Sequence, residues 1–173
     1  MLASTDRALR RRNGPLAVLA TALVLIAAPA AADVVIHRGL VGPVETLDPQ
    51  KAGTFEEAAI LTDLFKGLVT IDALGRPVPG AAENWTVSPD GLVYTFALRK
   101  DGRWSNGDAV KAADFVASFR RLFAPETGAT EDGALQVIKN AAPIKQGLAK
   151  PDTLGVRAVD PLTLEITLEQ PTP

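Results

Sequence analysis

Few side chains in this sequence have the type and spacing that catalysis needs. The single histidine, His37, follows a short β-branched run, and neither a second histidine nor a Gly-x-Ser-x-Gly turn is present to complete a nucleophilic triad. A lone histidine on a strand is more often structural than catalytic. We therefore expect no catalytic centre, and a hydrolase is the less favoured alternative.

The sequence also lacks the usual patterns of metal and phosphate sites. It has no cysteine and no pair of histidines, the common zinc ligands. The acidic pairs Glu56 with Glu57 and Glu131 with Asp132 have no neighbours suited to acid–base work. The stretch 102–107 has a glycine at each end, but aspartate follows where a phosphate-binding loop has Lys-Ser or Lys-Thr. We expect neither cofactor nor metal ion.

A helix is expected to begin at Thr54. Thr54 and Glu57 have the spacing of a capping box, in which each side chain accepts a hydrogen bond from the other residue's backbone N–H. Glu56 adds negative charge to the first turn, which the helix dipole favours. Gly67 is expected to end the helix, and its apolar face is predicted from helical spacing to contain Leu61, Leu64, Phe65 and Leu68.

Two hairpins are predicted in the remainder. Alternating residues of 84–87 and 92–98 flank Ser-Pro-Asp-Gly at 88–91, a tight-turn sequence. Tyr94, Phe96 and Leu98 are expected on one face of the second arm. A similar pair, 156–159 and 162–168, flanks Asp-Pro at 160–161.

Further elements follow from the same patterns. Helices are expected over 108–122 and, more weakly because of a proline at 143, over 135–148, and a strand is expected over 34–36. The outer face of the 108–122 helix carries two arginines, and its apolar side carries Phe115, Val116, Phe119 and Leu122. The two tryptophans, Trp85 and Trp104, are expected to pack in the core or between strands rather than to stack on a ligand.

The first 32 residues have the pattern of a cleaved export signal. Four arginines precede an apolar run at 16–28, and three alanines at 30–32 offer a cleavage site. A membrane anchor is the alternative, but a spanning helix needs roughly 20 apolar residues. The arginines at 10–12 suggest a twin-arginine leader, although their neighbours fit the general secretion route better. No cysteine follows the cleavage site, so we expect a soluble periplasmic protein rather than a lipoprotein.

The charge of residues 33–173 disfavours one class of partner. Residues 33–173 contain 14 basic and 19 acidic residues, because the first 32 hold four of the 18 basic and one of the 20 acidic residues. The net charge near −5 disfavours nucleic acid, which requires a basic face to neutralise its phosphates.

Several blocks, in order, resemble the peptide-type (family 5) extracellular solute-binding proteins of bacterial ABC importers. The blocks are TLDP at 46–49, DLFKGL at 63–68, PGAAENW at 79–85, YTFALRKDGRWSNG at 94–107, the helix 112–121, and the stretch 154–173. Lys111 and Asn106 depart from the family pattern, which has threonine and aspartate there. The resemblance covers nearly all of 33–173.

The resemblance implies a mixed α/β fold, with α+β character in this part, of the type II periplasmic binding protein kind. It divides the chain into a signal peptide at 1–32, the start of the first lobe at 33–65, a small additional α+β domain at 66–168, and a return to the first lobe at 169–173. It also implies that the backbone of Gly53, Thr54 and Phe55 contacts a bound peptide, although Thr54 has a complete structural role as a cap.

The resemblance further implies a monomeric, non-enzymatic binding component that delivers oligopeptides to ABC permease subunits in the inner membrane. Same-fold alternatives are dipeptides, murein peptides, glutathione, nickel, haem or an opine; a secreted hydrolase and a chaperone-like module belong to other classes. The chain is expected to be the N-terminal part of a longer protein, and 33–173 alone is expected to bind no peptide.

Overall fold

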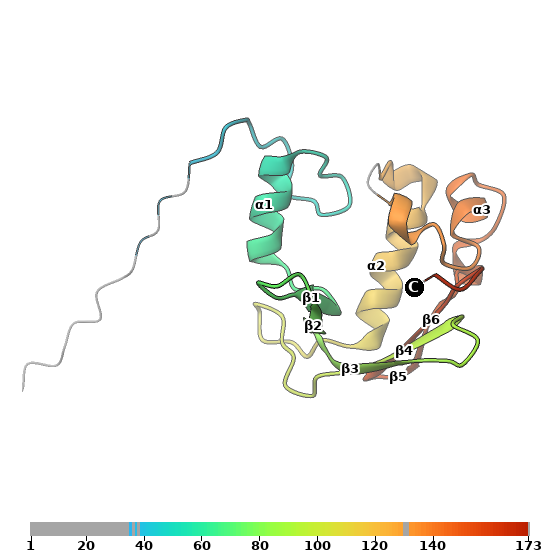
Figure 1. Ribbon diagram of the computed structural model, residues 1–173. Helices are drawn as coiled ribbons and strands as arrows, with labels where there is room; N and C mark the ends of the chain where they lie inside the picture. The colour runs from blue at the N-terminus through green and yellow to red at the C-terminus, as the bar shows by residue number, and fades with distance from the viewer. Residues whose placement is uncertain (1–34, 36, 38, 130–131, 173) are drawn as a thin grey trace, which may run out of the picture. The chain divides into compact units, whose positions relative to one another are not determined.

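A four-stranded antiparallel sheet organises the computed structural model (Figure 1). It consists of β3 (Ala82–Val87), β4 (Val93–Leu98), β6 (Thr163–Thr167) and β5 (Val156–Asp160), in the spatial order β3-β4-β6-β5. Each outer pair is one of the two predicted hairpins, and both predictions are confirmed. The hairpins join where β4 pairs with β6, so segments about 70 residues apart lie side by side.

The structure describes residues 35, 37, 39–129 and 132–172. The predicted signal peptide therefore lies outside the described residues, as do two of the three residues of the expected strand 34–36. Val35 and His37 are described, and neither belongs to a strand. The described residues from Gly39 onward form one compact unit.

The turn between β3 and β4 shows why its sequence predicted a hairpin. Gly91 has a φ of 72°, a value that glycine adopts without steric cost. The Ser88 hydroxyl accepts a hydrogen bond from the Val93 N–H, and an Asp90 carboxylate oxygen accepts one from the Leu92 N–H. Side-chain acceptors thus satisfy the backbone of the turn without help from the rest of the fold.

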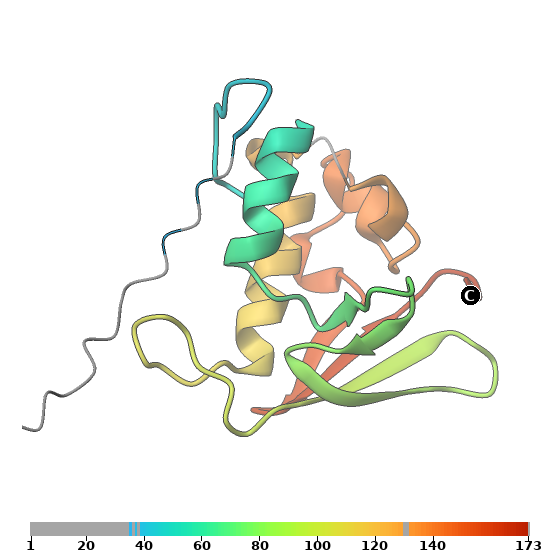
Figure 2. The ribbon, with the colours of Figure 1, turned by 60° about the vertical axis from the view of Figure 1, so that its left-hand side comes forward.

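The core lies between this sheet and two helices, α2 (Ala112–Phe123) and α3 (Ala141–Lys145). Figure 2 shows α2 standing over the sheet, and the helix packs on β5 and β6. The largest fully buried apolar side chains are Phe123, Ile138, Ile144 and Leu164. The predicted apolar side of α2 is half-buried against them, as is Trp85, whose packing role is confirmed.

Three expectations for this region are wrong in detail. The helix begins at Ala112 rather than 108, because a tight turn occupies the preceding residues: the Trp104 N–H donates to the Asp108 carbonyl and the Gly107 N–H to that of Trp104. Trp104 is 46% exposed, not buried. In place of a helix over 135–148 the chain forms the 3-10 turn η2 (Gly133–Leu135) and the short α3.

The 3-10 turns η1 (Pro125–Thr127) and η3 (Pro151–Thr153) complete the region around α2 and α3. Among the described residues, no helix combines the length and the apolar character that a membrane crossing requires.

The first helix, α1 (Phe55–Leu64), begins at the predicted N-cap but ends earlier than Gly67, with Phe65 as its C-cap. Its predicted apolar face is mostly uncovered: Leu61 is buried, whereas Leu64 is 61% and Phe65 is 49% exposed. Burial in α1 is therefore confined to Leu61 and the polar Glu57.

A two-stranded hairpin, β1 (Val69–Ile71) with β2 (Pro77–Pro79), links α1 to the main sheet. At its base, Gly80 lies so close to the chain leaving α1 that a Cβ there would be 2.3 Å from the Gly67 carbonyl oxygen. The Gly80 N–H donates to the Leu68 carbonyl, and the Ala81 N–H donates to the Gly67 carbonyl. The glycines of the blocks 63–68 and 79–85 thus meet where two backbones touch.

Replacing Gly80 with alanine is expected to destabilise the fold by about 3 kcal/mol, near the upper end for single substitutions, because backbone must move to admit the methyl group. Urea unfolding measures the loss. Gly133→Ala is the matched control, since a Cβ at Gly133 meets nothing within 4 Å. Equal stabilities for the two variants would contradict the close approach.

Candidate ligand-binding site

The three residues predicted to contact ligand line an open groove of about 590 Å³ at the start of α1. The groove is otherwise mostly apolar, and its lining residues are Pro49, Ala52, Gly53, Thr54, Phe55, Ala58, Leu61, Thr62 and Phe65. Phe55 is 83% exposed beside it. The structure thus places the predicted segment on an accessible surface, with room for a ligand alongside.

Thr54 occupies the N-cap of α1, as its sequence context predicted. Its backbone is extended, with φ −109° and ψ 157°, and its hydroxyl accepts a hydrogen bond from the Glu57 N–H at 3.2 Å. The Glu57 carboxylate in return accepts from the Thr54 N–H at 3.1 Å, so the capping box is complete.

Glu57 does much more than close this box. Its side chain is 2% exposed, and its two oxygens accept hydrogen bonds from four backbone N–H groups. Oε1 accepts from Glu45 at 3.0 Å and Thr46 at 2.9 Å, and Oε2 accepts from Gly53 at 2.9 Å as well as from Thr54. One carboxylate therefore holds both ends of the loop 45–54.

These donors stabilise the charged form of the carboxylate. The Gly53 N–H contributes most, followed by the Thr46 N–H, and together with the other donors they outweigh burial and lower the pKa of Glu57 from 4.5 to about 2. The sequence showed Glu57 as a capping residue only, because its two partners at 45 and 46 lie outside any local motif.

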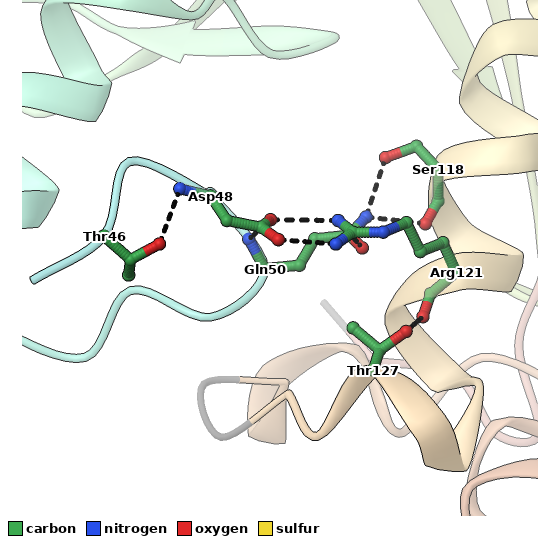
Figure 3. Close-up of polar contacts among 6 residues, drawn as sticks. All are labelled: Thr46, Asp48, Gln50, Ser118, Arg121 and Thr127. Carbon is green, nitrogen blue, oxygen red and sulfur yellow. Dashed lines mark hydrogen bonds and ion pairs between the residues drawn. The ribbon is translucent and has the colours of Figure 1, made fainter.

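A second anchor joins the same loop to α2 (Figure 3). The Arg121 guanidinium donates to both oxygens of Asp48, at 2.9 and 2.5 Å, and to the side-chain oxygen of Gln50 at 2.8 Å. The Gln50 amide donates to the Ser118 carbonyl and hydroxyl at 2.8 and 3.1 Å. Hydrogen bonding to Arg121, helped by the Gln50 N–H, lowers the pKa of Asp48 to about 2.

Sequence reasoning did not assign this anchor. Asp48 belongs to the block 46–49, and Ser118 and Arg121 belong to the helical block 112–121, so all three were part of the resemblance. Their one-turn spacing puts Ser118 and Arg121 on the same side of α2, which was a usable signal. What the sequence lacked was any indication that the two blocks meet.

The remaining candidate residues form no site. Asp132, from the second acidic pair, is 2% exposed and pairs with Lys145 at 2.5 Å, whereas Glu131 lies outside the described residues. Glu56 lies in the first turn of α1, and His37 is exposed. In the part of the chain that the structure describes, no cluster of His, Cys, Asp or Glu could hold a metal ion.

Gly53, Thr54 and Phe55 thus form an exposed segment beside an open groove. The sequence matches the family described as "Bacterial extracellular solute-binding proteins, family 5 Middle" over residues 76–173. The chain belongs to this family of solute-binding proteins, and the family predicted from the sequence blocks is confirmed.

Individual relatives agree. The chain is 45% identical over 130 residues to the probable deoxycholate-binding periplasmic protein YgiS of Escherichia coli (strain K12), covering 74% of this chain and 24% of that protein. It is 43% identical over 132 residues to the periplasmic oligopeptide-binding protein OppA of the same organism, covering 75% and 24%. The chain thus spans about a quarter of the length of these relatives.

A solved structure gives the same result for the fold. The Haemophilus influenzae OppA complex with the peptide RPPGFSPFR matches with a TM-score of 0.71 and 42% identity, over 74% of this chain and 25% of that one. The predicted fold class, mixed α/β of the type II periplasmic binding protein kind, is confirmed.

Replacing Glu57 with glutamine is expected to lower the melting temperature by roughly 10 °C at pH 7. The amide NH₂ would face backbone donors in place of an accepting oxygen, leaving partly buried N–H groups unpaired. Thermal unfolding followed by circular dichroism measures the loss. Glu56→Gln, which removes the same charge one residue earlier, is the control and should melt close to the native protein.

The pH dependence gives a second readout of the same variant. Because the pKa of Glu57 is lower in the folded chain than its ordinary value of 4.5, the unfolded state binds the proton more readily. The contribution of Glu57 to stability is complete above pH 4.5 and is lost as pH falls toward 2. The native protein should therefore lose more stability over this window than Glu57→Gln; parallel curves would contradict the assignment.

Proposed function

We propose that the protein is the substrate-binding component of an ABC importer, that it binds oligopeptides and that it delivers them to permease subunits in the inner membrane. The main support is the family together with relatives named for oligopeptide binding at 41–43% identity. In this proposal the protein is periplasmic, monomeric and not an enzyme. Residues 1–32 act as a cleaved signal, and no lipid is attached.

The same proposal assigns the parts of the chain. Residues 33–65 begin the first of two lobes that close over ligand, residues 66–168 form an additional small domain, and residues 169–173 return to the first lobe. The four-stranded sheet with α2 and α3 fits such a self-contained domain, because it has its own hydrophobic core. The exposed apolar residues of α1 fit a helix that packs on further parts of a lobe.

The observation that carries peptide binding is the pattern of used and unused backbone groups at Thr54. The Thr54 N–H donates to Glu57, and its carbonyl accepts from the Ala58 N–H. In an extended chain, the preceding carbonyl and the following N–H point to the opposite edge. There, the Gly53 carbonyl and the Phe55 N–H have no hydrogen-bond partner among the described residues.

These two free groups have the arrangement that pairs with one residue of an extended peptide. That residue would donate its N–H to the Gly53 carbonyl and accept from the Phe55 N–H, as in a parallel ladder. Main-chain pairing of this kind gives affinity with little dependence on side chains, which suits a protein that takes many peptides. The apolar groove beside Phe55 would accommodate a side chain of the ligand.

A bile-acid-like ligand is the second candidate, because the relative YgiS is named for probable deoxycholate binding. A steroid has no repeating N–H and carbonyl groups to pair with the segment. The two candidates therefore differ in whether binding needs the Phe55 N–H.

Replacing Phe55 with proline is expected to weaken peptide binding by roughly tenfold, about the loss of one good hydrogen bond together with its desolvation. Proline is tolerated at the first helical position, and the extended backbone of Thr54 suits a residue before proline, so the helix should survive. Phe55→Ala, which loses the ring but keeps the N–H, is the matched control for the main-chain contribution.

Isothermal titration of the protein produced from its complete gene measures both variants, first with mixed tripeptides to pentapeptides and then with deoxycholate. Saturable peptide binding that is weaker in Phe55→Pro than in Phe55→Ala supports the proposal. Binding of deoxycholate but of no peptide, with the two variants alike, would replace it with the second candidate.

A further inference from the structure

We propose that Arg121 is a positioning residue for ligand binding: from α2 it holds the loop 46–52, and through that loop the Gly53–Phe55 segment, in place against the α2 side of the molecule. This inference rests on the proposed function, since it concerns how the same segment is fixed. Arg121 itself does not line the groove beside Phe55.

The first argument is how weakly this part of the chain is otherwise attached. In α1 only Glu57 and Leu61 are buried, so little packing fixes the helix to the rest of the unit. Glu57 binds the loop 45–54 to α1, but both belong to the same stretch of chain. Glu57 therefore makes the stretch rigid within itself without fixing it to the sheet and α2.

The second argument is where the attachment to α2 lies. Within the described residues, every hydrogen bond that joins 45–57 to the chain beyond Leu68 runs from Asp48 or Gln50 to Ser118 or Arg121. Local bonds hold Asp48 itself: its backbone N–H donates to the Thr46 hydroxyl, and its carboxylate accepts from the Gln50 N–H. The loop thus presents the side chains of Asp48 and Gln50 to α2, with the Asp48 carboxylate already held by the loop (Figure 3).

The third argument is the geometry at the arginine. Its guanidinium makes a two-pronged contact with the Asp48 carboxylate and shares one nitrogen with Gln50, which fixes direction as well as distance. The Thr127 hydroxyl donates to the Arg121 carbonyl at 2.5 Å, which ties the last turn of α2 to η1. A lysine could supply the positive charge but not the paired N–H donors that contact both oxygens of Asp48.

Asp48 and the Gly53–Phe55 segment are a few residues apart in sequence, and local hydrogen bonds hold the residues between them. The Lys51 and Ala52 N–H groups both donate to the Asp48 carbonyl at 3.0 Å, and the Gly53 N–H donates to Glu57. If Asp48 moves relative to α2, the Gly53 carbonyl and the Phe55 N–H, which are proposed to bind ligand, should therefore move with it.

The test compares Arg121→Gln with Arg120→Gln in the protein produced from its complete gene. Arg120 is the adjacent arginine on the same helix, it is exposed, and its guanidinium has no hydrogen bond or ion pair with another described residue. The two variants lose the same charge at neighbouring positions, so long-range electrostatics cancels in the comparison.

In titrations with mixed tripeptides to pentapeptides, Arg121→Gln should bind roughly tenfold more weakly than the native protein, and Arg120→Gln within about twofold of it. Because the Asp48–Arg121 pair is partly exposed, the melting temperature should change little in either variant.

Asp48→Asn should reproduce the loss of peptide affinity, and the double variant Asp48→Asn with Arg121→Gln should bind peptide no more weakly than either single variant. Arg121→Lys should recover part of the affinity. Native affinity in Arg121→Gln, or equal losses in both arginine variants, would overturn the inference.

Amide hydrogen exchange separates this result from a failure of the proposed function. Without any ligand, Arg121→Gln should exchange faster across 45–57 than Arg120→Gln, with unchanged protection in β4 and β6. If the native protein binds no peptide, the proposed function fails, and exchange alone decides whether Arg121 holds the segment. Unchanged exchange over 45–57 would refute the positioning role in either case.

Discussion

The candidate site depends on a single buried carboxylate. The loop 45–54 is irregular, so most of its backbone N–H groups lack the carbonyl partners that a helix or a sheet would provide; the N–H groups of Lys51 and Ala52, which donate to the Asp48 carbonyl, are exceptions. Glu57 accepts four of them at 2.9–3.1 Å, and this satisfies the polar backbone that would otherwise oppose burial. These bonds use the Thr54 N–H. The Gly53 carbonyl and the Phe55 N–H, on the opposite edge of the chain, have no partner among the described residues and are the groups that we propose pair with a ligand.

Two kinds of interaction stabilise the two parts of the fold. The sheet, α2 and α3 form a conventional apolar core centred on Phe123 and Leu164. The loop and α1 bury little apolar surface and are joined to that core by directional polar contacts through Arg121. Apolar burial supplies stability without direction, whereas a forked ion pair supplies direction at small energetic gain. Positioning of the proposed ligand segment therefore relies on the second kind.

Where local rules sufficed, the sequence predicted the structure well. Both hairpins, the N-cap at Thr54 and the apolar side of α2 follow from turn chemistry, capping and periodicity over a few residues. The errors came where a nearby or distant contact decided the outcome. Asp108 is not helical because its carbonyl closes the turn at Trp104, and α3 is confined between Asn140 and Gly147, which both have positive φ. The helix α1 ends at Leu64 although its apolar pattern continues.

The sequence by itself determined the family, the two hairpins and the N-cap at Thr54, because each of these depends on residues that are adjacent or nearly so. The tertiary structure alone decided that β4 lies against β6, that Glu57 reaches back to Glu45 and Thr46, and that Asp48 meets Arg121 across 73 positions of the chain. Such pairings are set by how the elements pack, since a carboxylate has no preference for one particular donor until folding brings that donor within reach. The same holds at Thr54. Folding pairs its N–H with Glu57 and its carbonyl with the Ala58 N–H, whereas the Gly53 carbonyl and the Phe55 N–H on the opposite edge have no partner among the described residues.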